Sequence, residues 1–268
     1  MRTFFCSLLA AAWLTACAAP LLDAGRTSQL EALLPTQILL LGEQHDAAEH
    51  RRLERAVVRH LARRDTLAAL VVEMAERGRD TRGLPPDASA AQVREALAWN
   101  DAGWPWKAYG PVVMAAVRAG VPVVGGNLPH AQLRAAMQES TLDERLPAAA
   151  LARQRERIRE GHCDTLPEAR IAPMTRMQIA RDRSLAQTLL HERKPGRTVL
   201  LIAGNGHVVH DLGIPLHLPD AARVAVIVMQ AGELPADQPL PAADAVWVTP
   251  PTPPQDYCAR LRAKPATP

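Results

Sequence analysis

Short, continuous runs of apolar residues alternate along the chain with longer stretches in which apolar and polar positions repeat every three to four residues. A continuous apolar run is typical of a strand buried on both faces, and the longer pattern is typical of an amphipathic helix. Their alternation predicts an α/β fold with a mainly parallel central sheet flanked by helices. The predicted strands are 38–41, 70–72, 121–124, 199–203 and 224–229, with 245–248 as an edge strand.

The predicted helices are 45–64, 90–99, 109–118, 129–138, 143–160 and 167–192. The last three fall in a segment, 129–195, that has no strand pattern, so we interpret it as a helical cap inserted on the sheet. Pro173 is expected to kink or restart the last helix, because proline removes a backbone hydrogen bond. Residues 27–248 would form one α/β domain, followed by a Pro-rich, irregular tail over 249–268.

The first residues have the pattern of a lipoprotein signal peptide. One arginine precedes an apolar run over 4–14 that is too short to span a bilayer as a helix. The run ends in Leu14-Thr15-Ala16-Cys17, where small residues precede a cysteine. We expect residues 1–16 to be cleaved, Cys17 to carry lipid and residues 17–26 to tether the domain; the alternative is an ordinary signal peptide. Ala18, in place of aspartate, favours the outer membrane of the cell envelope, facing the periplasm.

Composition indicates an ordinary globular domain, with 48% hydrophobic and 22% charged residues. The net charge is +3, or +2 once Arg2 is removed with the signal peptide, which is too small to indicate nucleic-acid binding. After Cys6 and Cys17 are set aside, Cys163 and Cys258 remain. In an oxidising compartment we expect these two to form a disulfide, and two free buried thiols are the alternative.

Polar side chains and glycines follow four of the predicted strands. The first strand leads into the segment Gly-Glu-Gln-His-Asp at 42–46, and the second ends at Glu73. The third leads into Gly-Gly-Asn at 125–127 and the fourth into Gly-Asn-Gly-His at 204–207. Ligands bind outside the carboxyl ends of strands in open α/β sheets. We therefore expect a functional cleft at this edge, although each motif alone would also suit a turn or a helix cap.

The ionisable groups at this edge suit acid–base chemistry or a divalent metal, as in a hydrolase. The residues concerned are Glu43, His45, Glu73 and His207. No His-Glu-x-x-His pattern is present, so the local indication of a metal is weak. Gln178 and Asp182 lie four positions apart on a predicted helix and would either reach the cleft from the cap or form an exposed polar face.

Aromatic residues are scarce but cluster within 99–109, where Trp99, Trp104, Trp106 and Tyr109 occur. Such a cluster serves as plain packing or as an apolar platform for a flat ligand. Tyr109 and Tyr257 are the two tyrosines of the sequence, and a tyrosine phenolate can hold ferric haem iron. No Cys-x-x-Cys-His is present, which excludes covalent haem attachment of that type.

Seven segments, taken together and in order, resemble the ChaN family of haem-binding lipoproteins. That family belongs to a superfamily with the Tiki metalloproteases and the erythromycin esterase-like proteins. The segments include Leu-Leu-Leu-Gly-Glu-Gln-His-Asp (39–46), Trp-Pro-Trp-Lys-Ala-Tyr-Gly-Pro (104–111) and Ile-Ala-Gly-Asn-Gly-His (202–207). The others are 71–74, 121–127, 161–167 and 177–182. The set covers nearly the whole mature chain and is specific, although each piece alone is not.

The resemblance implies haem or iron uptake at the cell envelope. In ChaN-like proteins two monomers enclose a pair of stacked haems, a tyrosine ligates each iron, and a histidine contacts haem from across the dimer. It therefore implies haem and a second copy of the chain as partners, with Tyr109 as the candidate iron ligand and Tyr257 also open. The partner histidine is open between His50, His130 and His162. The residues expected near the haem are Trp106, Asn127, Gln178 and Asp182.

Three functions remain open at this point. The first is a haem-binding lipoprotein without catalysis. The second is an envelope hydrolase or peptidase of the Tiki-like kind, in which the strand-end Glu and His residues bind a divalent metal or share proton-transfer roles. The third is a lipoprotein scaffold whose cleft is vestigial.

Overall fold

The computed structural model describes residues 22–234 and 240–263. The expected signal peptide, the expected lipidation site Cys17 and the first part of the expected tether lie outside the described residues. Within the described ranges, no helix is both long and apolar enough to cross a membrane. The first described helix begins at Ala24, so the tether is at most the segment before it.

The sheet has six strands, and every neighbouring pair is parallel. Their order is β3-β2-β4-β1-β5-β6. This confirms the predicted α/β fold and the predicted edge strand. The strands are β1 (Ile38–Glu43), β2 (Leu67–Glu76), β3 (Val123–Asn127), β4 (Thr198–Gly204), β5 (Val224–Ala231) and β6 (Ala245–Thr249). Because all strands are parallel, all of their carboxyl ends lie at the same edge of the sheet.

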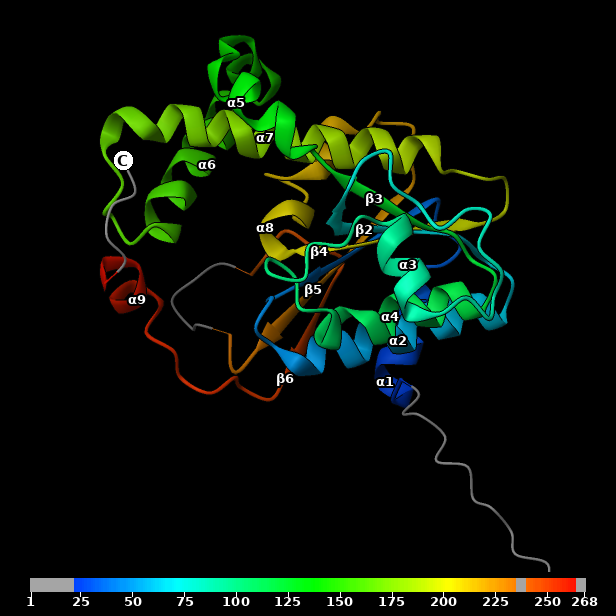
Figure 1. The fold of residues 1–268 in the computed structure, drawn as a ribbon. Coiled ribbons are helices and arrows are strands. Elements are labelled where there is room, and N and C mark those ends of the chain that lie inside the picture. Colours follow the sequence, from blue (N-terminus) through cyan, green and yellow to red (C-terminus); the bar gives the residue numbers. More distant parts are fainter. Residues whose placement is uncertain (1–21, 235–239, 264–268) are drawn as a thin grey trace, which may run out of the picture.

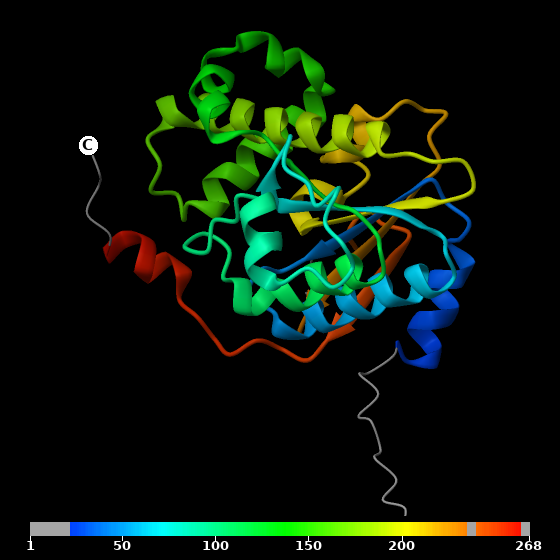
Figure 2. The ribbon, with the colours of Figure 1, turned by 45° about the vertical axis from the view of Figure 1, so that its right-hand side comes forward.

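Helices cover both faces of the sheet (Figures 1 and 2). One face carries α1 (Ala24–Ala32), α2 (Ala48–Arg63), α3 (Ala90–Ala96) and α4 (Trp106–Arg118). The other carries α5 (His130–Gln138), the 3₁₀ helix η1 (Ser140–Arg145), α6 (Ala148–Gly161), α7 (Glu168–His191) and the 3₁₀ helix η2 (Ile214–His217). The short helix α8 (Asn205–Val208) follows β4 at the carboxyl edge, and α9 (Tyr257–Ala263) lies near the end of the chain.

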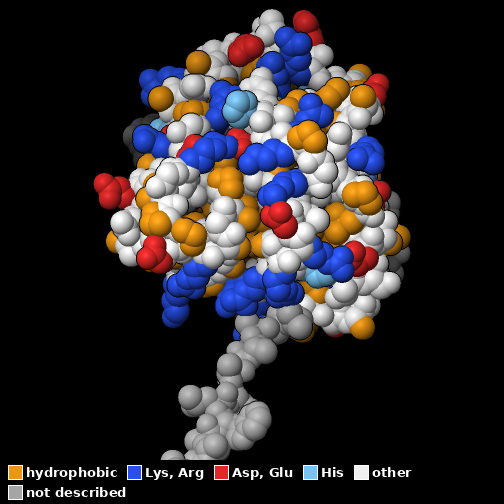
Figure 3. Space-filling view, turned by 90° about the vertical axis from the view of Figure 1, so that its right-hand side faces the viewer, with side chains coloured by type: hydrophobic (Ala, Val, Ile, Leu, Met, Phe, Trp, Pro, Cys, Tyr) orange, Lys and Arg blue, Asp and Glu red, His pale blue; other side chains and the backbone are white. Residues whose placement is uncertain are grey.

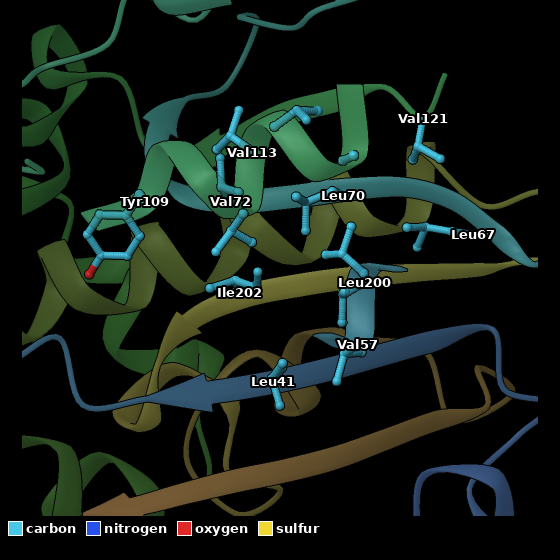
Figure 4. Packing of buried hydrophobic residues seen from close by; sticks show 14 of the residues in the cluster. Leu41, Val57, Leu67, Leu70, Val72, Tyr109, Val113, Val121, Leu200 and Ile202 are labelled. Atoms are coloured by element: carbon cyan, nitrogen blue, oxygen red, sulfur yellow. The ribbon is translucent and has the colours of Figure 1, made fainter. Parts of the chain in front are cut away.

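Two apolar clusters, one on each face, explain why the strands have continuous rather than alternating hydrophobicity. Along β1, Leu39 and Leu41 belong to one cluster, and Ile38 and Leu40 belong to the other. Successive strand residues point to opposite faces, so a strand covered on both faces needs an apolar residue at every position. Figure 4 shows part of the first cluster, with Tyr109 at its end and its hydroxyl directed away from the aliphatic side chains.

Several elements differ from the predicted ones. Helix α2 begins at Ala48 rather than at residue 45, because the residues after β1 form a turn. Helix α4 begins at Trp106 rather than at residue 109. The Trp106 backbone N–H donates a hydrogen bond of 2.6 Å to the Asp101 carboxylate at this start. Pro173 lies inside α7 without ending it. The tail is not irregular throughout, because it contains α9.

The structure contains the predicted disulfide between Cys163 and Cys258, whose Cα atoms are 5.6 Å apart. Cys163 follows the end of α6, and Cys258 is the second residue of α9. The bond therefore attaches the C-terminal segment to the helical layer formed by α6 and α7.

An irregularity near the end of β2 explains the two consecutive glycines of β3. Val72 pairs with Gly125 and Glu76 pairs with Asn127, so β2 uses residues 73–75 where β3 uses Gly126 alone. The extra residues bulge over β3, and a Cβ on Gly125 would lie 2.1 Å from the carbonyl oxygen of Glu76. Glycine at 125 therefore permits the bulge that contains Glu73.

We predict that Gly125→Ala lowers the free energy of unfolding by about 3 kcal/mol, because the backbone of β2 must move to accept the methyl group. The control is Gly161→Ala at the end of α6, where an added Cβ meets nothing within 4 Å. That change should leave stability equal or raise it by up to about 1 kcal/mol. Urea unfolding of both variants measures the difference, and equal stabilities would contradict this account of the bulge.

Candidate functional site

A buried cluster of carboxylates and imidazoles occupies the carboxyl edge of the sheet. Glu43 ends β1, Glu73 lies in the bulge of β2, and His207 lies on α8 directly after β4. Asp182 reaches the same place from α7 and is 2% exposed. The structure thus brings together groups from four separate segments, and we call them the strand-end cluster. Its members are Glu43, His45, Glu73, Tyr109, Gln178, Asp182 and His207.

His207 lies between two buried carboxylates. Its Nδ1 donates to Oδ1 of Asp182, and its Nε2 lies 3.4 Å from Oε1 of Glu73. Burial alone would lower the pKa of His207, but Glu73 and Asp182 outweigh it and raise that pKa to about 10. The same contact works in reverse on Glu73: burial opposes ionisation, yet His207 and His45 lower the pKa of Glu73 to about 2. At neutral pH the ring is therefore an imidazolium and is not available as a base.

Further polar groups hold this arrangement in place. The backbone N–H of Gly204 donates to Oε2 of Glu73 at 2.9 Å and fixes that carboxylate. The side-chain amide of Gln178 lies beside the His207 ring. Asn127 does not enter the cluster with its side chain. Its Nδ2 donates to the backbone carbonyl of Glu73 at 2.9 Å and so supports the bulge of β2.

A second part of the cluster is built around Glu43. The hydroxyl of Tyr109 donates to Oε1 of Glu43 at 2.7 Å, and Nδ1 of His45 lies 2.8 Å from the same oxygen. The Tyr109 side chain is 4% exposed. Burial and the neighbouring Glu43 charge raise the pKa of Tyr109 well above its ordinary value. His45 is the most open member of the cluster, with 43% of its side chain exposed, and is the group best placed to exchange protons with solvent.

Two residues near Glu43 could not be assigned to the site from the sequence. Glu54, on α2, is fully buried beside Glu43, and burial together with the Glu43 charge raises its pKa well above the ordinary value. Burial and the Glu43 charge therefore both favour the protonated form of Glu54. Arg51 lies with its guanidinium 5.4 Å from the centre of the Tyr109 ring and 3.9 Å from Oε2 of Glu43. The sequence indicates a special role for Glu54 in one way: it is a charged residue among the apolar positions of residues 53–61.

The aromatic segment divides into two parts. Trp104 packs edge-on against His45, with ring centres 4.9 Å apart, and against Tyr109 at 5.7 Å. Trp106, expected near a bound haem, packs against Trp99 at 5.0 Å and lies over Gly110. Trp104 therefore borders the strand-end cluster, whereas Trp106 contributes to packing between α3 and α4.

Three oxygens of the cluster carboxylates accept hydrogen bonds from imidazoles, a backbone amide or Tyr109, namely Oε1 of Glu43, Oε2 of Glu73 and Oδ1 of Asp182. In the described ranges, no three His, Cys, Asp or Glu side chains are arranged to hold a metal ion. The predicted divalent metal at Glu43, His45, Glu73 and His207 is therefore not supported.

A groove of about 630 Å³ lies beside the cluster, between α6 and the segments that follow β1, β4 and β5. Its apolar wall consists of Val209, Leu212, Val228, Leu240, Pro241 and Ala242. Arg153 and Arg157 project from α6 into it. Arg153 pairs with Asp211, whereas Arg157 makes no ion pair with any residue that the structure describes.

Tyr257 is held from two sides by segments that continue from the lining of this groove. Its hydroxyl donates to Oδ2 of Asp46, two residues beyond Gln44, which lines the groove. The next residue, Cys258, is bonded to Cys163 just beyond the end of α6, which carries the two groove arginines. The Tyr257 side chain is 49% exposed. Two of the histidines expected to contact haem from across the dimer differ in exposure. His50 is fully buried, whereas His130 is exposed.

Residues 29–218 match the family model described as haem-binding uptake, Tiki superfamily, ChaN. The chain belongs to this ChaN family. Its structure is similar to that of ChaN of Campylobacter jejuni, a structure with cofacial haem binding, with a TM-score of 0.63 and 22% sequence identity. The similarity covers 78% of this chain and 87% of that chain. The shared fold places the residues after the parallel strands at one edge, as in the present structure.

Two other solved structures are more distant. The type III effector HopBA1 aligns with a TM-score of 0.42 and 14% identity, over 81% of this chain and 88% of that chain. A protein of Bacillus cereus aligns with a TM-score of 0.41 and 14% identity, over 78% of this chain and 73% of that chain. No curated protein matches the chain.

We predict that the imidazolium of His207 makes stability depend on pH. The folded-state pKa of about 10 lies above the ordinary value of 6.5, so its contribution is fully present below pH 6.5 and is lost as pH rises through 10. Between pH 7.5 and 9.5 the free energy of unfolding should fall by up to about 1.4 kcal/mol per pH unit. Urea unfolding at several pH values measures this slope.

In His207→Gln the free energy of unfolding at pH 7 should be lower by about 3 kcal/mol, because Glu73 and Asp182 lose their buried counter-charge. The slope above pH 7.5 should flatten at the same time. His130→Gln, at an exposed position on α5, is the matched control and should change neither quantity. A variant at 207 that retains the wild-type slope would show that another group titrates.

Proposed function

We propose that this protein is an envelope lipoprotein, anchored through Cys17, that binds haem for haem or iron uptake and ligates the ferric iron through a tyrosine. Membership of the haem-binding uptake family supports the haem-binding role. The cofacial haem binding of the Campylobacter jejuni ChaN supports a homodimer that encloses haem. The lipobox around Cys17 supports attachment at the outer membrane, facing the periplasm.

The groove beside α6 is the best fit for haem in the described structure. Its volume of about 630 Å³ falls within the roughly 300–1,000 Å³ that is typical of small-molecule sites. Haem is a flat, apolar ring with two carboxylates at one side. The groove lining combines an apolar wall with two arginines and three acidic residues, Glu156, Glu160 and Asp211. Arg153 pairs with Asp211, whereas Arg157 makes no ion pair with a described carboxylate. Guanidinium groups bind carboxylates strongly and in a defined geometry.

Between the two tyrosines, the geometry favours Tyr257 as the iron ligand over Tyr109, which the sequence favours. Coordination requires a deprotonated oxygen that haem can reach. Tyr109 is buried, donates its hydroxyl hydrogen to Glu43 and has a strongly raised pKa. Tyr257 is half exposed, and its hydroxyl already donates its proton to Asp46, two residues beyond the groove residue Gln44. Asp46 is therefore in place to accept that proton when the phenolate binds iron.

A homodimer would supply the partner histidine. His50 is unsuited to this role, because its Nδ1 accepts from the Gln44 backbone N–H and its Nε2 contacts Oγ1 of Thr249 in the interior. Burial also lowers the pKa of His50 to about 4. His130 and His162 remain as candidates, and His162 is next to the cysteine that holds α9.

Addition of haemin to the chain from Ala18 onward should produce a saturable Soret band. We predict that Tyr257→Phe weakens haemin binding at least about a hundred-fold and removes the phenolate-to-iron charge-transfer band, whereas Tyr109→Phe retains both. Thermal unfolding of each variant checks that it is folded. The opposite pattern would assign the iron to Tyr109, and loss in neither variant would exclude tyrosine ligation.

Arg157→Gln should weaken haemin binding about ten-fold, because a charge-assisted hydrogen bond to a propionate is lost. Arg159→Gln is the control, since Arg159 is on the same helix but pairs with Glu156 and Glu168. Haemin dimethyl ester, which has no free carboxylates, distinguishes the mechanism: the wild type and Arg157→Gln should bind it equally. An undiminished Arg157 effect on the ester would contradict a propionate contact.

A further inference from the structure

Four arginines form a patch of uncompensated positive charge on the helical layer opposite α6 and α7. Arg55, Arg59 and Arg63 are spaced by four residues along α2 and therefore form one stripe on that helix. Arg118 lies in the last turn of α4, which packs beside α2. In the part of the chain that the structure describes, none of the four makes an ion pair. We call them the arginine patch.

The carboxylates close to the arginine patch are already engaged with other bases. Glu49 pairs with Arg52, and Glu31 of α1 pairs with His60 and Arg64. The pKa of the Arg59 guanidinium is lowered, first by partial burial and then by Arg55, Arg63 and Arg118. Like charges spaced by four residues on a helix destabilise it. The stripe therefore does not stabilise the isolated domain, and this favours a role in binding an external anion.

The first described helix packs on the same layer as this patch. Helix α1 lies beside α2, to which Glu31 ties it, and Figures 1 and 2 show both helices on the same side of the sheet. The first described residue is Leu22, five positions after Cys17. Five residues span at most about 17 Å, which is roughly two Debye lengths at physiological salt. A lipid on Cys17 would hold this side of the domain within electrostatic reach of a membrane.

We propose that the arginine patch docks the domain on an anionic phospholipid surface. Guanidinium groups bind phosphodiester oxygens with two parallel hydrogen bonds, and juxtamembrane basic clusters bind negatively charged bilayers. Figure 3 shows Lys and Arg side chains gathered along the lower edge of the face turned toward the viewer. Docking through α2 and α4 directs α6 and the groove away from the lipid. The proposal does not depend on haem binding.

The test uses the chain from Ala18 onward without an acyl group, which contains the whole described fold. Its sedimentation with vesicles of phosphatidylcholine alone is compared with vesicles containing phosphatidylglycerol. Binding should require phosphatidylglycerol and fall steeply between 50 and about 300 mM salt. The variant Arg59→Gln/Arg63→Gln/Arg118→Gln should reduce partitioning about a hundred-fold, because each arginine near such a surface contributes about five-fold.

The matched control is Arg79→Gln/Arg134→Gln/Arg170→Gln. It removes the same charge from exposed arginines that have no ion pair in the described ranges and lie away from α2 and α4. This control should stay within about five-fold of the wild type, and thermal unfolding confirms that both variants are folded. Equal losses in the two triple variants, or equal binding to both kinds of vesicle, would overturn the proposal.

Discussion

The contact of the His207 imidazolium with the carboxylates of Glu73 and Asp182 joins three segments at the carboxyl edge of the sheet. These three buried residues come from β2, α7 and the segment after β4, which apolar packing alone would not orient. Removing His207 would leave two buried carboxylates without their counter-charge, which is more destabilising than losing an apolar contact. The bulge of β2, permitted by Gly125, is the backbone feature that brings Glu73 to this contact.

The sheet was predictable because its strands are buried on both faces. A run such as residues 38–41 must then be apolar at every position, and this leaves a clear signal in the sequence. Helix starts were less predictable, since α4 begins where Asp101 accepts a backbone hydrogen bond, and this local contact overrides the pattern. Helix α9 was missed because it has only seven residues, lies in a Pro-rich tail and is held by the disulfide.

The convergence of Glu43, Glu73 and His207 was likewise predictable, since the parallel strands end at one edge. What the sequence could not indicate is how these groups satisfy one another. Pairing makes His207 a cation at neutral pH, and a hydrogen bond to Glu43 keeps Tyr109 protonated in the interior. The pKa of Glu54 is raised because folding buries it and places it beside Glu43. Each of these protonation states depends on residues that are distant in sequence, so no single sequence motif predicts it.

The disulfide makes the proposed haem site depend on the redox conditions of the compartment that contains the protein. A helix as short as α9 is not stable by itself, and its Tyr257 and Leu261 are largely exposed. Its position therefore depends on the bond to Cys163 and on the hydrogen bond to Asp46. In a reducing compartment the first of these ties is lost, and Tyr257 is held less firmly beside Asp46. Under the proposed function, export to an oxidising compartment is thus a condition for haem binding, because the same bond that closes the fold positions the ligand.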